Sequence, residues 1–231
     1  IYATLGISAS YDDLRTLESA SDSLKKQAGE FSEITGNYGF TYDKRNRAFM
    51  PTSGSIIKFN QSLPIFADSA AIGNTFSSST YKSFGENLIG AGKIYLSAVN
   101  SVGADDVRLS KRLNIPTNRI RGFERGKIGP MDGTDHIGGN YAGAINFEAA
   151  LPNLLPEATK TDVALFLDFG NVWGVDYDST IDESNKIRSA TGIALDYLSP
   201  IGPLSFSWSV PLTKTSSDKT ETFRFNLGTT F

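Results

Sequence analysis

Alternation of apolar and polar side chains with a period of two is the dominant pattern in this chain. It is clearest between Leu204 and Leu212, where apolar residues occupy every second position and serines fill three of the positions between them. Because successive side chains of a β-strand point to opposite faces, the pattern predicts strands with one apolar and one polar face. Ten segments fit it: 1–14, 31–45, 55–67, 73–84, 90–103, 141–151, 162–174, 187–199, 204–214 and 222–231.

The lengths of the strands and of their connections predict a membrane barrel. Most segments are at least ten residues long, whereas strands of soluble proteins usually have about 5–6 residues and tilted membrane strands about 9–11. Compact turns rich in proline and glycine alternate with longer, more charged loops, a sorting typical of outer-membrane barrels. The turns lie near 50–54, 85–87, 152–161 and 199–203, and the loops near 15–30, 104–140, 175–186 and 215–221. A soluble β-sandwich also has alternating strands, but it gives no reason for this sorting.

Composition restricts the possible functions further. The 231 residues contain no cysteine, which excludes disulfides, thiolate metal sites and cysteine nucleophiles. The 22 basic and 25 acidic residues are mixed along the chain with no basic stripe, so no nucleic-acid partner is expected. We expect one all-β domain over residues 1–231, because no linker divides the chain. Ile1 falls inside a predicted strand, and we therefore interpret the chain as an internal or C-terminal part of a longer precursor.

The segment 104–140 is the longest one without strand periodicity. Structureless loops beyond about 12–15 residues are uncommon in compact folds and are usually functional or disordered. This loop contains the run Ile120-Arg121-Gly122-Phe123, followed by several glycines. We predict that the loop folds back into a β-barrel and anchors Arg121 to acidic residues on the inner wall.

Two carboxylates lie on the inward-facing register of the strands that follow the loop. They are Glu148, with Asn146 on the same face, and Asp168 on the next strand. An arginine inside a barrel needs a carboxylate, and its planar fork favours bidentate pairing. Gly122 would let the backbone pass close to the wall, with Phe123 packed beside it. The loop is expected to act as a strut. The alternative is that Arg121 is exposed to solvent and that Glu148 and Asp168 face water.

Several segments, taken in their order along the chain, resemble one family. They are the turn Pro51–Gly54, the run Arg121–Phe123, the strand Phe169–Trp173, the hairpin Leu198–Leu204 and the strand Phe225–Phe231. Together they are similar to the BamA family of outer-membrane assembly factors, bacterial surface antigens of the barrel-assembly insertase superfamily. The resemblance implies a sixteen-stranded transmembrane barrel that follows periplasmic domains. The ten strands would be the last ten, and Glu148 and Asp168 would match the family's acidic partners of the loop arginine.

The resemblance also implies a function without enzymatic chemistry. Such a protein folds and inserts β-barrel proteins into the bacterial outer membrane, and its partners are unfolded barrel substrates, outer-membrane lipids and, through the absent periplasmic domains, accessory lipoproteins. No catalytic residue, metal or cofactor is expected. The last strand meets the first at a weak lateral seam, which opens so that a substrate strand can add to it. The residues of this strand are Phe223, Phe225, Leu227, Gly228 and Phe231, with Gly228 at the family's kink position.

Two other functions remain open from the sequence. A transporter of the same superfamily would secrete one partner polypeptide through its lumen and would share the loop motif. A self-contained ten-stranded barrel would act as a porin or an outer-membrane protease. His136 is the only histidine and lies near Asp132 and Asp135, but its glycine-rich loop does not favour catalysis.

Overall fold

The computed structural model describes residues 1–103, 105–200 and 202–227, and it is built around one ten-stranded antiparallel sheet. Ten strands were predicted, and the fold class is confirmed. A single sheet of this size also means that the β-sandwich alternative is wrong. The strands are β1 (Tyr2–Leu14), β2 (Gly29–Asp43), β3 (Gly54–Ala67), β4 (Ala71–Ser83), β5 (Ile89–Ser101), β8 (Tyr141–Leu151), β9 (Thr161–Trp173), β10 (Arg188–Ser199), β11 (Gly202–Thr213) and β12 (Phe223–Leu227).

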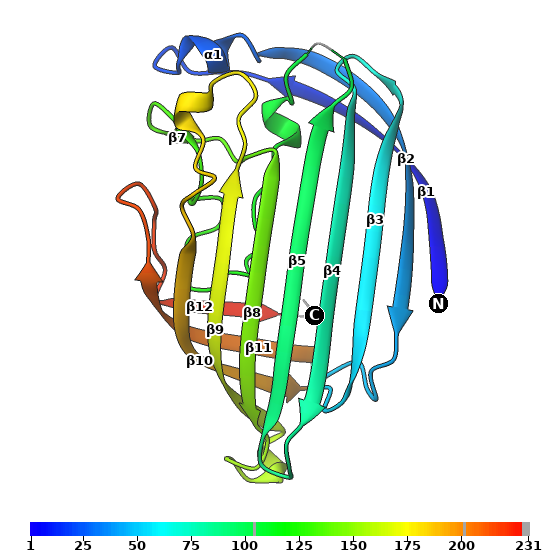
Figure 1. Cartoon of the computed structure of the whole chain (residues 1–231), viewed down its shortest axis with the longest axis vertical. Helices are drawn as coiled ribbons and strands as arrows, with labels where there is room; N and C mark the ends of the chain where they lie inside the picture. The colour runs from blue at the N-terminus through cyan, green and yellow to red at the C-terminus, as the bar shows by residue number, and fades with distance from the viewer. Residues whose placement is uncertain (104, 201, 228–231) are drawn as a thin grey trace.

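These ten strands pair in sequence order, so each of the eight inner strands is hydrogen-bonded to the sheet strand before it and the one after it. Within the described residues β1 pairs only with β2, and β12 pairs only with β11, which leaves the sheet open. Figure 1 shows that the sheet nevertheless curls strongly, with β11 and β12 running at a steep angle to β4 and β5. This curvature gives the sheet a concave inner face and a convex outer face.

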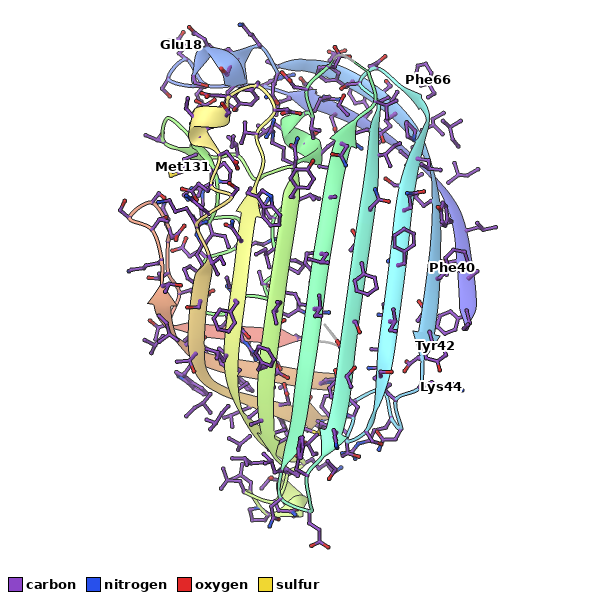
Figure 2. All side chains as sticks on the ribbon, in the orientation of Figure 1. Glu18, Phe40, Tyr42, Lys44, Phe66 and Met131 are labelled. Atoms are coloured by element: carbon purple, nitrogen blue, oxygen red, sulfur yellow. The ribbon has the colours of Figure 1, made fainter. Side chains whose placement is uncertain are left out.

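The two faces follow the alternation in the sequence. The outer face carries exposed apolar side chains on every long strand except β4, as Figure 2 shows for Phe40 on β2 and Phe66 on β3, which are 50% and 57% exposed. The inner face carries small and polar side chains, many of them buried. A surface that is apolar outside and polar inside suits a sheet with lipid on its convex side. Among the described residues, no helix has the length and apolar character needed to cross a membrane.

The long loop occupies the concave face and supplies part of the protein's core. A buried apolar cluster joins side chains of the loop to alanines and a valine of β8, β9 and β10. Its members are Ile115, Ile120, Phe123, Ile128, Ala142, Ala144, Val172 and Ala190. Leu113 and Gly139 exchange two backbone hydrogen bonds of 2.7 and 3.0 Å, which close the neck of the loop. The loop is therefore an ordered element packed against the inner wall.

Local structure inside the connections was not predicted in detail. The loop contains a hairpin of two very short strands, β6 (Met131–Asp132) and β7 (Asp135–His136), and a turn of 3-10 helix, η1 (Leu109–Lys111). The connection between β1 and β2 holds the four-residue helix α1 (Asp22–Lys25). The remaining turns of 3-10 helix are η2 (Glu157–Thr159) and η3 (Ser179–Ile181).

Candidate functional site

Arg121 reaches from the loop to the inner face of β9 and forms a two-pronged ion pair with Asp168. Its Nε donates to Asp168 Oδ2 at 2.8 Å, and its Nη2 donates to Oδ1 at 2.7 Å. The Arg121 backbone N–H also donates to Oδ2 at 3.1 Å. The Asp168 side chain is fully buried. Side-by-side bonds of this kind fix both the distance and the orientation of the guanidinium, so the pair holds the loop in one position.

Glu148 on β8 completes the charge balance around Arg121. Its Oε1 accepts from Arg121 Nη2 at 2.9 Å, and its Oε2 accepts from Lys93 Nζ of β5 at 2.6 Å. Two cations and two carboxylates therefore lie together, in what we call the Arg121 clamp (Arg121, Asp168, Glu148 and Lys93). Asn146 donates to both Asp168 Oδ1 and the Arg119 carbonyl, at 2.9 and 2.7 Å. The sequence prediction named Arg121, Glu148 and Asp168 as partners but missed Lys93. The only sign of Lys93 in the sequence is that this lysine occupies an inward-facing position of its strand.

Phe166 supports the guanidinium from one side. The Arg121 Cζ lies 3.6 Å from the centroid of the Phe166 ring, and Phe166 is 3% exposed. Phe166 and Asp168 are two residues apart on β9, so they share the inner face. A cation stacked on an aromatic face is attracted by the negative charge of the ring face. Phe166 was not predicted as a partner, because stacking depends on loop geometry that a strand pattern does not contain.

Gly122 and Phe123 follow Arg121 in close contact with the wall. Gly122 has φ +89°, a conformation that L-residues with a side chain rarely adopt, and a Cβ at this position would lie 3.0 Å from the Cβ of Ala190. Phe123 is 1% exposed and belongs to the apolar cluster, as does Ile120. The four residues of the predicted run thus have distinct physical roles, since the outer two pack, the arginine pairs and the glycine lets the backbone pass close to the wall.

A second ion pair holds the loop near the rim that carries the long connections. The fully buried Arg112 side chain donates through Nη2 to Asp176 Oδ1 at 2.6 Å. Asp176 Oδ2 also accepts from the backbone N–H of Val107 at 2.6 Å and from Asn140 Nδ2 at 3.2 Å. Burial acts to raise the pKa of Asp176, but these hydrogen bonds and the charge of Arg112 outweigh it and lower the pKa below its usual value.

A third buried arginine joins the last two long connections. Arg188, at the start of β10, has no exposed surface. Its Nε and Nη2 donate to the Asp218 carboxylate at 2.9 to 3.2 Å, and its Nη1 donates to Asn171 Oδ1 at 2.7 Å. Glu183 completes the network as a second carboxylate partner. The sequence prediction missed Arg188 because the alternation in segment 187–199 gives its face but not its contacts.

Three of the five predicted seam residues lie on the outer face of β12. Phe223, Phe225 and Leu227 are 45%, 50% and 60% exposed. Phe223 packs on Trp208 and Phe225 on Phe206 of β11, each with ring centroids 5.1 Å apart. The other two predicted seam residues, Gly228 and Phe231, lie outside the described residues.

His136, the histidine of the sequence, lies in the long loop. It pairs with Met131 in the β6–β7 hairpin, and its Nε2 is buried without a hydrogen-bond partner. The Asp132 carboxylate accepts instead from the Tyr177 hydroxyl at 2.8 Å.

Comparison with known proteins assigns the fold to a family. The model of the Omp85 superfamily domain matches residues 2–231. The chain is 31% identical over 141 residues to the outer membrane protein assembly factor BamA of Neisseria meningitidis, covering 48% of this chain and 17% of that protein. It is 27% identical over 238 residues to BamA of Neorickettsia risticii, covering 98% and 31%. A SAM50-like protein of Schizosaccharomyces pombe is 24% identical over 213 residues, covering 87% and 45%.

A solved structure shows the same fold. The crystal structure of BamA from Haemophilus ducreyi lacking POTRA domains 1–3 matches with a TM-score of 0.86 and 24% identity, over 96% of this chain and 50% of that one. The chain spans less than half the length of the curated relatives named above. The chain therefore belongs to the Omp85 superfamily, as the C-terminal part of a BamA-like β-barrel.

Proposed function

We propose that the protein containing this chain folds β-barrel proteins and inserts them into the bacterial outer membrane. Three relatives named as outer membrane protein assembly factors support this function, and so does the apolar outer face, which suits contact with outer-membrane lipids. The protein uses no covalent chemistry and no cofactor. The free energy released when the substrate folds drives insertion. Accessory lipoproteins bind through periplasmic domains that lie outside these 231 residues, which form one domain.

The observation that carries the proposal is the Arg121 clamp. It places a loop of the concave face in contact with β8 and β9 through charged groups that are largely removed from water. Breaking one partner of a buried ion pair leaves an unpaired charge and costs on the order of 3–5 kcal/mol. The loop thereby acts as a strut. It keeps the curvature of the wall while the barrel opens elsewhere.

The opening takes place at the last strand. Within the described residues β12 has one neighbour in the sheet, β11, with which it pairs from Phe223 to Leu227. Unpaired backbone groups are costly in lipid, so an opened edge attracts the terminal strand of a substrate. That strand adds by β-augmentation, in which backbone hydrogen bonds supply the affinity. We assign Phe223, Phe225, Leu227, Gly228 and Phe231 to this seam.

Replacement of Arg121 tests the strut. Arg121→Ala in the full-length protein should lower the heat stability of the barrel and slow the assembly of an unfolded barrel substrate in liposomes. Arg125→Ala is the matched control, because Arg125 lies in the same loop and is exposed. Exchange of charges between Arg121 and Asp168 should restore part of the loss. Heat stability and assembly equal to wild type in Arg121→Ala would refute the strut. Secretion of a single partner polypeptide without barrel assembly would favour the related transporter.

A further inference from the structure

The chain that leads into the last strand pairs with the loop before it pairs with the sheet. The N–H of Glu124 donates to the Lys219 carbonyl at 3.0 Å, and the N–H of Lys219 donates to the Lys127 carbonyl at 3.1 Å. The N–H of Glu221 then donates to the Gly122 carbonyl at 3.1 Å. Contact with β11 begins after these bonds, where the N–H of Ser209 donates to the Thr222 carbonyl at 2.8 Å and Phe223 lies opposite Trp208. The loop and the start of β12 therefore form a short ribbon of their own.

Arg224, the second residue of β12, reinforces this ribbon with its side chain. Its Nη1 donates to the Thr117 carbonyl at 2.6 Å, and its Nη2 donates to the Phe123 carbonyl at 2.5 Å. Its Nε donates to Glu221 Oε2 at 2.9 Å. The side chain is 10% exposed. Thr117 and Phe123 lie on either side of Arg121, so one guanidinium holds both ends of the segment that carries the clamp.

The chemistry of these bonds favours arginine at this position. Both loop acceptors are backbone carbonyls, which point in fixed directions, and a planar guanidinium offers five N–H donors in a rigid fork. A neutral amide offers two donors on one nitrogen, and a lysine offers one compact charge. Neither replacement can satisfy two separate carbonyls and a carboxylate in the same geometry.

We propose that Arg224 is a positioning residue that fastens the start of the last strand to the loop, so that the loop and residues 219–224 move as one body. The Arg121 clamp joins that body to β8 and β9. The remainder of β12, from Phe225 onward, is then the part that leaves its neighbour when the barrel opens. This assignment rests on the proposed lateral seam for its role in assembly, whereas the coupling itself can be measured without any substrate.

Hydrogen exchange in the full-length protein, reconstituted in phospholipid nanodiscs, tests the coupling. In Arg224→Gln the amides of 117–124 and of 219–222 should exchange about tenfold faster or more, as expected when a hydrogen bond from a charged group is lost, and both segments should change together. Amides paired between β10 and β11 should keep their wild-type rates. Arg224→Lys should fall between the two, and Arg125→Gln, an exposed arginine of the same loop, should match wild type. Unchanged exchange of either segment in Arg224→Gln overturns the proposal.

A disulfide provides the readout that a general loss of stability would not give. Glu124 and Lys219 are joined by a backbone hydrogen bond and are both exposed, so Glu124→Cys with Lys219→Cys can staple the ribbon. The oxidised staple should restore substrate assembly to Arg224→Gln, and it should not slow assembly in the otherwise wild-type protein. Loss of assembly on oxidation of the otherwise wild-type protein, reversed by a reductant, would show that the ribbon must open and would overturn the proposal. If both segments change together in Arg224→Gln but the wild-type protein assembles no substrate, the proposed function is refuted and the coupling stands.

Discussion

Removal of the negative charge of Asp168 is the sharpest test of the clamp. Asp168→Asn preserves the size of the side chain but leaves one acceptor oxygen where the carboxylate has two. In the folded protein those two oxygens accept four hydrogen bonds, three from Arg121 and one from Asn146. The new amide N–H₂ must point toward the Nε or the Nη2 of Arg121, both of which are donors. The substitution therefore removes a charge and sets donor against donor at a side chain that has no exposed surface.

The structure allows the cost to be ranked against a second carboxylate. A hydrogen bond to a charged group contributes about 1.5–3 kcal/mol, and breaking a buried ion pair costs about 3–5 kcal/mol. Glu148 stays 2.9 Å from Arg121 and keeps part of the charge balanced, so Asp168→Asn should cost about 3 kcal/mol. Glu148→Gln leaves the Asp168 fork intact, and the Glu148 side chain is 17% exposed, so its cost should be about 1–2 kcal/mol.

The assay is urea unfolding of the full-length protein in liposomes, followed by the change from compact to extended mobility on a gel. Each carboxylate variant is measured alone and combined with Arg121→Met, which gives the coupling energy of each pair. The Arg121–Asp168 coupling should be the larger of the two. Equal couplings, or an Asp168→Asn protein within about 0.5 kcal/mol of wild type, the range usual for a surface substitution, would refute the assignment of Asp168 as the main anchor.

Three further perturbations test other parts of the loop. Gly122→Ala should destabilise the docked loop by about 1–3 kcal/mol, since it combines a positive φ with a close approach to Ala190, measurable in the same urea assay. Burial, aided by the charge of Lys127, lowers the pKa of His136 below its ordinary value. The stability that this contributes is present above about pH 6.5 and is lost as the pH falls through the folded pKa, so protease cleavage of the β6–β7 hairpin should increase in acid and His136→Gln should remove that dependence. Asp176→Asn should destabilise the docking of the outer part of the loop by about 1–3 kcal/mol. The measurement is faster proteolysis of the segment before η1.

The sequence predicted the strands well because alternation is a property of each strand alone. A residue that faces lipid must be apolar whatever its neighbours are, so the ten segments could be located without knowledge of the pairing. The same alternation placed Glu148 and Asp168 on the inner face, where the structure pairs them with Arg121. The β6–β7 hairpin could not be found in this way, because two residues per strand are too few to show a period.

The sequence prediction missed residues whose orientation follows from the strand pattern but whose contacts do not. Arg224 alternates with aromatic residues in the last strand, which predicts that it points inward. The pattern does not reveal that two loop carbonyls accept from it there, since backbone acceptors have no sequence signature. Lys93 and Arg188 were missed for related reasons. Inward-facing cations on predicted barrel strands are thus good candidates for contacts with a loop inside the lumen.

Two routes connect the wall at β9 with the last strand, and they differ in their response to water. One route runs through the sheet ladder from β9 to β12, whose final step is the described pairing with the five residues of β12. The other runs through the loop, from Asp168 to Arg121 and from the Thr117 and Phe123 carbonyls to Arg224. Backbone ladders in lipid become no weaker when the lumen hydrates, whereas ion pairs and charged hydrogen bonds lose most of their strength once water reaches them. Hydration of the concave face therefore weakens the loop route selectively, and the polar contacts of the loop, rather than the apolar outer face, hold the start of the last strand in place.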